Sequence, residues 1–266
     1  MLCRVPQKEA QKIALRLKKH LVDQGILDIE QENLNQSLFQ LAQSFGISET
    51  CFSLYSKVLQ FYQLKLPSVI VLYGVHQVSM TEIAGRIAER LNIYNVLDTD
   101  TVYHIWRLVT STDTTVNSSY YATSSWLVPW EDSSWLEALE GNLFRFIREG
   151  KAVIIYGLFL QPMAIASMLE KYGSRPYFLQ YLIESELFQV SSTFQEDSKL
   201  EESRQLYTQL YDIQQEYKQR AQQRANIPSF LVDSTKESIA QLVERVHEDY
   251  LRLIVSLSEQ TILQNH

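Results

Sequence analysis

The feature that most constrains this chain is segment 69–91, where an apolar run meets a glycine and then a helical pattern. Val69 to Leu72 are all apolar, Gly74 follows, and apolar residues at helical spacing continue to Leu91. A buried strand that turns into a helix is the building unit of parallel sheets covered by helices. The segment therefore predicts an α/β domain.

The same segment resembles a phosphate-binding loop (P-loop) that has lost most of its chemistry. The intact motif has a second glycine where Ser79 stands, a lysine at Met80 and Ser or Thr at Thr81. The lysine contacts the β- and γ-phosphates, and the hydroxyl binds Mg²⁺. We therefore expect Gly74, His76, Ser79, Met80 and Thr81 to line a degenerate nucleotide site, with Thr81 as the remaining metal ligand.

Simpler interpretations of this segment stay open. It is also compatible with an ordinary strand, turn and helix, in which Thr81 is a first-turn residue. His76 could donate to an anion or be a solvated side chain. Arg86 and Arg90 lie along the expected helix and are interpreted as surface charges.

Composition excludes several classes of protein. The net charge of −7 argues against a general nucleic-acid surface, which would be basic. The two cysteines, Cys3 and Cys51, have no spacing typical of a zinc site or a disulfide framework, so a reducing cytoplasm is expected. The start of the sequence lacks an apolar secretory signal, and no run reaches the roughly 20 apolar residues of a membrane helix.

The chain divides into two expected regions. Helical patterns cover 7–24, 31–45 and 48–64, and Pro67 closes them, which predicts a small all-helical module at 1–66. Strand and helix patterns then alternate over 67–266. The expected strands are 68–73, 94–97, 152–156, 176–182 and 228–232, and the expected helices are 80–91, 101–110, 132–149, 162–172, 198–225 and 236–258. This alternation predicts a five-stranded parallel sheet flanked by helices.

The order of landmarks along almost the whole chain resembles the archaeal-type 2-phosphoglycerate kinases. In that family an N-terminal helical region similar to an ATP-cone precedes a P-loop kinase domain. The resemblance rests on four further segments: 96–102 (VLDTDTV), 118–122 (SSYYA), 153–162 (VIIYGLFLQP) and 206–234. It implies a P-loop kinase-like fold, and it implies ATP and Mg²⁺ as cofactors if the site still functions.

The resemblance places Asp100 on the aspartate expected near the acceptor or the catalytic metal. For Asp98 and Asp100 an alternative is capping of the following helix. Three departures remove a charged or polar group: Met80 replaces the lysine, Tyr156 a strand-end glutamate and Phe159 a histidine. In addition, Ser79 replaces a glycine of the loop. Region 183–203, where the family carries an arginine-bearing lid, contains no arginine.

An aromatic group in 120–135 has two interpretations. It contains Tyr120, Tyr121, Trp126, Trp130 and Trp135. Such a group is either a satellite core under a long connection or a surface that binds a protein partner.

Three functions follow from these patterns. The first is a 2-phosphoglycerate-kinase-like protein that has lost phosphoryl transfer and acts as a regulatory or protein-binding factor. The second is an active, atypical small-molecule kinase that uses His76, Thr81 and Asp100 with a distant arginine, either Arg107 or Arg175. The third is a sensor that binds a nucleotide without hydrolysing it.

Overall fold

The computed structural model describes residues 2–75, 77–110, 134–158, 177–185, 210–219, 227–232 and 236–264, and the single residues 160, 165, 168, 171 and 208. The chain divides into two compact units. One contains Met1–Leu64, Arg90–Asn92 and His247–His266, and the other contains Lys65–Glu89 and Ile93–Val246. The predicted division between residues 66 and 67 stays a prediction.

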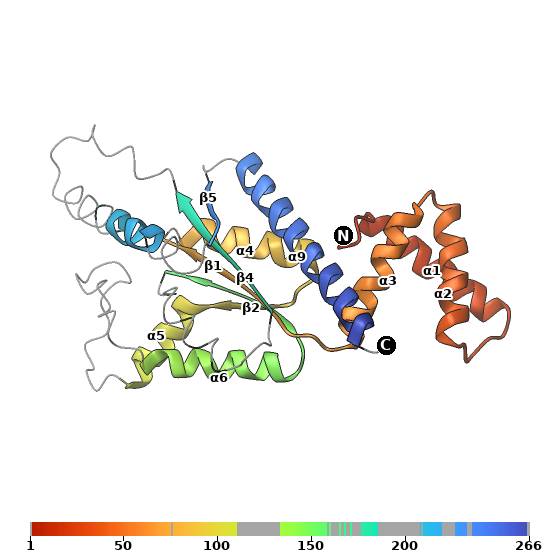
Figure 1. The fold of residues 1–266 in the computed structure, drawn as a ribbon, viewed down its shortest axis with the longest axis horizontal. Coiled ribbons are helices and arrows are strands. Elements are labelled where there is room, and N and C mark those ends of the chain that lie inside the picture. The colour runs from red at the N-terminus through yellow and green to blue at the C-terminus, as the bar shows by residue number, and fades with distance from the viewer. Residues whose placement is uncertain are drawn as a thin grey trace. The chain divides into compact units, whose positions relative to one another are not determined.

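The first unit is built from helices (Figure 1). It contains α1 (Gln7–Asp23), α2 (Gln31–Ser44), α3 (Glu49–Gln63) and the second half of α9 (Lys236–Gln264). The first three helices lie within one residue of their predicted bounds. Gly25 ends α1 at a φ of +67°, and the N–H of Ile26 reaches back to the Leu21 carbonyl at 2.9 Å. This is the left-handed helix end for which glycine is preferred.

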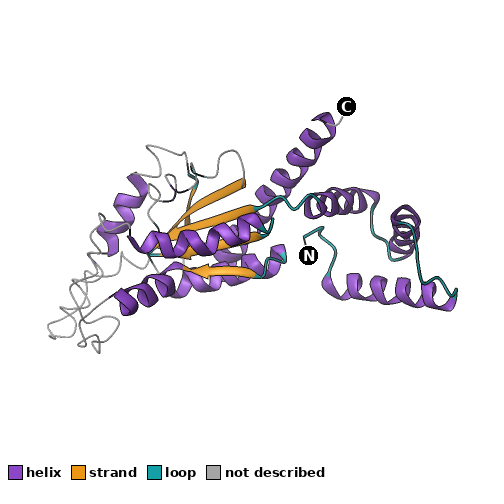
Figure 2. Ribbon diagram, turned by 90° about the horizontal axis from the view of Figure 1, so that it is seen from below, coloured by secondary structure: helices purple, strands orange, loops and turns teal. Residues whose placement is uncertain are grey.

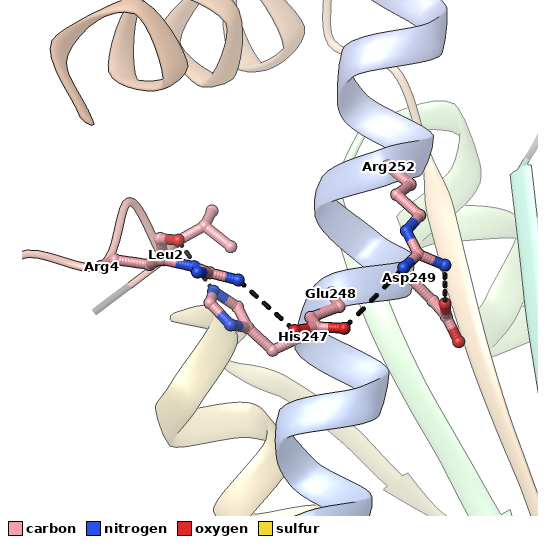
Figure 3. A network of polar contacts seen from close by, with 6 residues as sticks. All are labelled: Leu2, Arg4, His247, Glu248, Asp249 and Arg252. Atoms are coloured by element: carbon pink, nitrogen blue, oxygen red, sulfur yellow. Dashed lines mark hydrogen bonds and ion pairs between the residues drawn. The ribbon is translucent and has the colours of Figure 1, made fainter. Parts of the chain in front are cut away.

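Polar contacts join the first residues of the chain to α9 (Figure 3). His247 is fully buried, and its Nε2 lies 2.8 Å from the Leu2 carbonyl oxygen, which accepts the hydrogen bond. On the adjacent surface, Glu248 lies between two guanidinium groups, 3.5 Å from Arg4 and 3.8 Å from Arg252. The buried histidine bond is the more stabilising of these contacts, because exposed ion pairs contribute little.

The second unit contains a five-stranded parallel sheet, as predicted. Its strands are β1 (Ser68–Gly74), β2 (Asn95–Asp98), β3 (Ala152–Gly157), β4 (Tyr177–Ser185) and β5 (Ser229–Val232), in the order β2-β3-β1-β4-β5. Every residue of β1 is buried, because a strand in the middle of a parallel sheet is covered on both faces. The fold is therefore α/β, a five-stranded parallel sheet flanked by helices.

Helices cover both faces of the sheet (Figures 1 and 2). One face carries α5 (Thr99–Thr110) and α6 (Ser134–Arg148), and the other carries α4 (Gln77–Leu91) and the first half of α9. Val69, Val71 and Tyr73 of β1 share one apolar cluster with Leu139 and Leu143 of α6. Alternate residues of a strand point to opposite faces, which places the remaining β1 side chains toward α4.

Two element bounds differ from prediction in ways that affect the site. The helix expected from residue 80 begins at Gln77, so three residues predicted as part of a phosphate-binding turn are helical. Between Gly74 and Met80 the sequence has no second glycine, and nothing in it opposes an early start of the helix. Strand β4 continues to Ser185, beyond its expected end at 182.

Within the described residues, no helix has the length and apolar character needed to cross a membrane.

Candidate functional site

The candidate site is the carboxyl edge of the sheet, where α/β proteins place their ligands. The central strand β1 ends there at Gly74, and α4 begins three residues later at Gln77. The neighbouring strands β3 and β4 end there at Gly157 and Ser185. The side chains at these strand ends decide which ligand the edge can bind.

Met80 occupies the space next to Gly74. The methionine is 1% exposed, and a Cβ added to Gly74 would lie 2.6 Å from its sulfur. The same added Cβ would lie 3.2 Å from the carbonyl oxygen of Ile183 in β4. Gly74 therefore allows an apolar side chain and a neighbouring strand to approach the end of β1, and Met80 offers no charge there.

Thr81 contacts Tyr156, the next-to-last residue of β3. The hydroxyl of Tyr156 donates to Oγ1 of Thr81 at 3.4 Å, a long contact. Burial raises the pKa of Tyr156, the bond to Thr81 lowers it, and the nearby carboxylates of Asp98 and Asp100 raise it further. The phenol of Tyr156 therefore stays neutral at physiological pH. It lies near Thr81, Asp98 and Asp100, the polar residues predicted to belong to the site.

Asp98 caps helix α5. Its Oδ1 accepts from the backbone N–H of Asp100 at 2.9 Å and of Thr101 at 3.3 Å, and its Oδ2 accepts from the Thr101 hydroxyl at 3.0 Å. An aspartate at this position satisfies N–H groups of the first helical turn and interacts favourably with the helix dipole. The capping alternative is the one that the structure supports for Asp98.

Asp100 joins the start of α5 to the end of β3. It is 3% exposed, and its Oδ1 accepts from the Leu158 N–H at 2.8 Å. Beside it, the Thr99 hydroxyl donates to the Tyr156 carbonyl at 3.0 Å. A Cβ on Gly157 would lie 2.1 Å from Oγ1 of Thr99 and 2.6 Å from Oδ1 of Asp100. Asp100 therefore has a structural role in this junction, and its catalytic role stays a prediction.

Residues 217 and 218 reach the same edge from a helical segment, 210–219. Tyr217 is 1% exposed, and its hydroxyl donates to the carbonyl of Leu158, just after β3. Lys218 lies 2.9 Å from Oε2 of Glu184, near the end of β4, and the Glu184 side chain is only 11% exposed. The edge thus has a basic group that is absent from the loop.

The remaining predicted residues are distributed as follows. Seven of these residues lie outside the described part of the chain: His76, Phe159, Arg175, Tyr120, Tyr121, Trp126 and Trp130. For Ser79 the structure describes only the backbone, which belongs to α4. Arg86 pairs with Glu82 at 2.7 Å on the exposed face of α4, as expected for a surface charge. Trp135 is 2% exposed and packs against Tyr103, so it belongs to the core. Among the described residues, no group of three or more His, Cys, Asp or Glu is placed to hold a metal ion.

The contact between Glu184 and Lys218 was not predicted from the sequence. The two residues are 34 positions apart, and neither belongs to a motif. Lys218 follows Tyr217 in a long polar helical pattern, where a lysine is normally solvated. The only available signal was the acidic residue at the end of an apolar strand, because a buried carboxylate needs a partner.

No protein-family model matches the chain. The 2-phosphoglycerate kinase of Methanopyrus kandleri is 25% identical over 263 residues, which span 92% of this chain and 76% of that protein. The 2-phosphoglycerate kinase of Methanococcus maripaludis is 25% identical over 272 residues, which span 92% of this chain and 85% of that protein. The 2-phosphoglycerate kinase of Methanocaldococcus jannaschii is 30% identical over 171 residues, which span 58% of this chain and 53% of that protein. Among solved structures, a gluconokinase from Sinorhizobium meliloti 1021 is 17% identical with a TM-score of 0.37, covering 76% of this chain and 99% of its own.

Proposed function

We propose that the chain, which is distantly similar to the 2-phosphoglycerate kinases, keeps their fold but acts as a binding or regulatory protein without phosphoryl transfer. The observation that carries this proposal is the burial of Met80 against Gly74, at the position where a P-loop has its lysine. Phosphoryl transfer depends on cations positioned around the transferring group. A methionine at this position supplies none.

The early start of α4 supports the same proposal. A phosphate-binding loop surrounds the phosphates with successive backbone N–H groups, which requires a non-helical turn rich in glycine. Residues 77–79 are instead helical, and their N–H groups have helical geometry. The segment between β1 and α4 is therefore too short to surround a triphosphate in the usual way.

The polar groups expected to face Mg²⁺ are a poor fit for it. Thr81 contacts Tyr156, both oxygens of Asp98 cap α5, and Asp100 accepts from the Leu158 N–H. A Mg²⁺ ion requires oxygen ligands in near-ideal octahedral geometry, usually from carboxylates, phosphates and waters. Oxygens that are already held in structural hydrogen bonds are poorly placed for this coordination.

The mode of action belongs to the proposal as well. We propose a protein partner for segment 120–135, of which Trp135 serves the core and not the surface. A cytoplasmic location fits the two free thiols, Cys3 and Cys51. An ATP-cone-like role for the N-terminal helices is part of the same regulatory proposal.

The test is direct detection of phosphoryl transfer. The full chain, at a concentration close to that of its substrates, is incubated with ATP, Mg²⁺ and 2-phosphoglycerate, and the reaction is followed by phosphorus NMR. We expect no new phosphorylated product above the rate without protein. Product formation would refute the proposal and favour the atypical kinase.

A matched variant guards against contaminating kinases. Asp100→Asn keeps an oxygen that can accept from the Leu158 N–H but removes the carboxylate charge. Any turnover that belongs to this chain should fall in the variant, because the predicted catalytic carboxylate is gone. Turnover that is equal in both preparations would come either from an impurity or from a mechanism that does not use Asp100.

A further inference from the structure

We propose that helix α1 carries a docking surface for an anionic lipid membrane, formed by lysines and by exposed aliphatic side chains beside them. This α1 surface consists of Lys8, Lys12, Leu15, Lys18, Lys19, Val22 and, just beyond the helix end, Leu27. A helix of this kind lies in the plane of the membrane surface and does not cross the bilayer. The inference goes beyond the proposed function, because it does not depend on whether the chain transfers phosphoryl groups.

Helix α1 buries only one narrow stripe of its surface. Ile13 is buried, and Leu17 and Leu21 are half-buried. These three residues follow one another at intervals of four positions, so they lie on one face of the helix. All other residues of α1 are exposed. Most of the helix is therefore accessible to a partner.

The face opposite this stripe carries an aliphatic line between basic residues. Leu15 and Val22 are 67% and 61% exposed. They are seven positions apart, so at 3.6 residues per turn they are almost in line along the helix axis. By the same geometry, Lys18 lies on one side of this line and the other three lysines lie on the other side, all within about 70° of it. Lysines that flank exposed aliphatic residues suit an anionic membrane interface, where the aliphatic groups enter and the ammonium groups stay at the headgroups.

The four lysines are accessible to such headgroups. All four are exposed, and no side-chain hydrogen bond or ion pair joins any of them to another residue in the described part of the chain. Lys8 and Lys19 are eleven positions apart, which corresponds to about 16 Å along the helix. The basic residues thus cover a length over which several lipid headgroups can be contacted at once.

Leu27 extends the aliphatic part of the surface past the end of the helix. It is 98% exposed, the highest value among the large hydrophobic residues described as exposed. It follows Gly25, whose φ of +67° ends α1. An isolated exposed leucine is ordinary, but here three large aliphatic residues are exposed within positions 15–27, next to lysines without ion-pair partners in the described part of the chain. Transfer of these side chains from water into the acyl boundary of a membrane is favourable.

The charge of α1 is opposite to that of the chain as a whole. The helix has five Lys and Arg residues and two acidic residues, whereas the whole chain has a net charge of −7. The acidic overall charge therefore does not exclude a local basic surface. At physiological ionic strength, charges act over about 8 Å, so the attraction of α1 to an anionic surface depends mainly on its own lysines.

The aliphatic residues favour a lipid surface over a nucleic acid. Proteins contact nucleic acids through basic and polar groups on the phosphates and often through aromatic side chains on which bases stack. Helix α1 contains no Phe, Tyr or Trp. A membrane surface is both anionic and able to accept aliphatic side chains, and this combination matches the α1 surface.

The experiment measures binding of the full chain to vesicles by flotation at increasing lipid concentration. Vesicles of equal parts of phosphatidylserine and phosphatidylcholine are compared with vesicles of phosphatidylcholine alone. We expect binding to the anionic vesicles to be at least about tenfold tighter, and to weaken as salt is added. No binding to the anionic vesicles, or equal binding to both kinds, would overturn the proposal.

A triple variant tests the lysines. Lys8→Gln with Lys12→Gln and Lys19→Gln removes the charge on one side of the aliphatic line and keeps residues that favour a helix. Binding to the anionic vesicles should weaken at least about tenfold. If this variant does not fold, the corresponding triple substitution by arginine retains the charge and should bind within about threefold of the unmodified chain. A folded arginine variant that does not bind would contradict a surface based on charge.

The matched control removes the same charge from the other compact unit. Arg86→Gln with Lys151→Gln and Lys171→Gln replaces three exposed basic residues that pair with glutamates. Its affinity for the anionic vesicles should stay within about twofold of that of the unmodified chain. An equal loss in the two triple variants would show that only the net charge matters, and the proposal would be wrong.

A double variant separates a lipid from other anionic partners. Leu15→Gln with Leu27→Gln leaves every charge in place, so it should weaken vesicle binding at least about fivefold and leave retention on a heparin column unchanged. If vesicle binding is the same with and without the two leucines, the surface binds polyanions by charge alone. That result would refute the lipid surface and favour a nucleic acid or an acidic protein as the partner.

Discussion

The sulfur of Met80 lies 2.6 Å from where a Cβ of Gly74 would be, so the side chain that replaces the P-loop lysine is packed against the loop glycine. Both residues are buried. In a working loop the glycine leaves room for a phosphate, and the lysine reaches that phosphate. Here the glycine leaves room for the methionine. The relation of these two residues is the physical basis for our proposal that the protein does not transfer phosphoryl groups.

Met80→Lys should destabilise the protein. Met80 is 1% exposed, and a charge placed there without a partner loses its hydration. We expect the free energy of unfolding to fall by about 3 kcal/mol. Met80→Leu, which conserves volume, should cost less than about 1.5 kcal/mol. Urea unfolding of both variants checks this, and a Met80→Lys protein as stable as the unmodified chain would show that an open site accepts the lysine.

Gly157→Ala should be among the most damaging small substitutions. A Cβ there would lie 2.1 Å from Oγ1 of Thr99 and 2.6 Å from Oδ1 of Asp100, and both atoms are held by hydrogen bonds. We expect a loss of about 3 kcal/mol, measured by thermal unfolding. Gly141→Ala is the control, because nothing lies within 4 Å of its added Cβ in the exposed face of α6. It should stabilise the protein by about 0.5–1 kcal/mol, and equal effects of the two substitutions would contradict the junction described here.

Asp100 should contribute to stability whether or not it touches a ligand. The Leu158 N–H donates to Oδ1 of Asp100 at 2.8 Å. Asp100→Ala removes this acceptor. We expect a cost of about 2 kcal/mol in the free energy of unfolding. Asp100→Asn, which retains an acceptor, should cost about half as much or less. If Asp100→Ala left stability unchanged, the carboxylate would have no structural role.

Stability should decrease at alkaline pH. Burial raises the pKa of Tyr73 and of Tyr156 above the ordinary value of 10.0. Below that value both phenols are neutral in the folded and unfolded states, whereas above it they ionise first in the unfolded chain, so the free energy of unfolding falls as pH rises. Urea midpoints at pH 8, 10 and 11 check this, and the decrease should be smaller in Tyr73→Phe.

The alkaline test requires one precaution. Burial also raises the pKa of the Cys3 thiol, from 9.0 to about 11, and this group contributes its own decrease in stability above pH 9. The titrations are therefore compared in a Cys3→Ser background. A pH profile that is unchanged by Tyr73→Phe in this background would refute the assignment to the buried phenol.

The sheet could be predicted because each strand leaves a local signal. The apolar runs at 68–73 and 152–156 became β1 and β3 with bounds shifted by at most one residue at their ends. Buried parallel strands are continuously apolar, so periodicity and length are sufficient to locate them. The first three helices were predictable from their apolar spacing, from the glycines that follow the first two, Gly25 and Gly46, and from Pro67 after the third.

The site could be predicted only in part, because its polar groups are positioned by contacts between distant residues. The sequence indicated that Met80 and Tyr156 replace polar residues, but not that Met80 packs on Gly74. It did not predict the early start of α4, since a motif comparison assumes the spacing of an intact loop. The pair formed by Glu184 and Lys218 depends on how segment 210–219 packs beside the ends of β3 and β4, and no local pattern in the sequence predicts that packing.

The most direct test of the central claim is calorimetric titration of ATP with and without Mg²⁺, for the unmodified chain and for Met80→Lys. If the loop no longer handles a nucleotide, Mg²⁺ should not strengthen ATP binding in either protein, and no binding tighter than about 100 μM should depend on the metal. Metal-dependent binding tighter than this by the unmodified chain would contradict the account, because it would show that the edge of the sheet still assembles a nucleotide site around Mg²⁺.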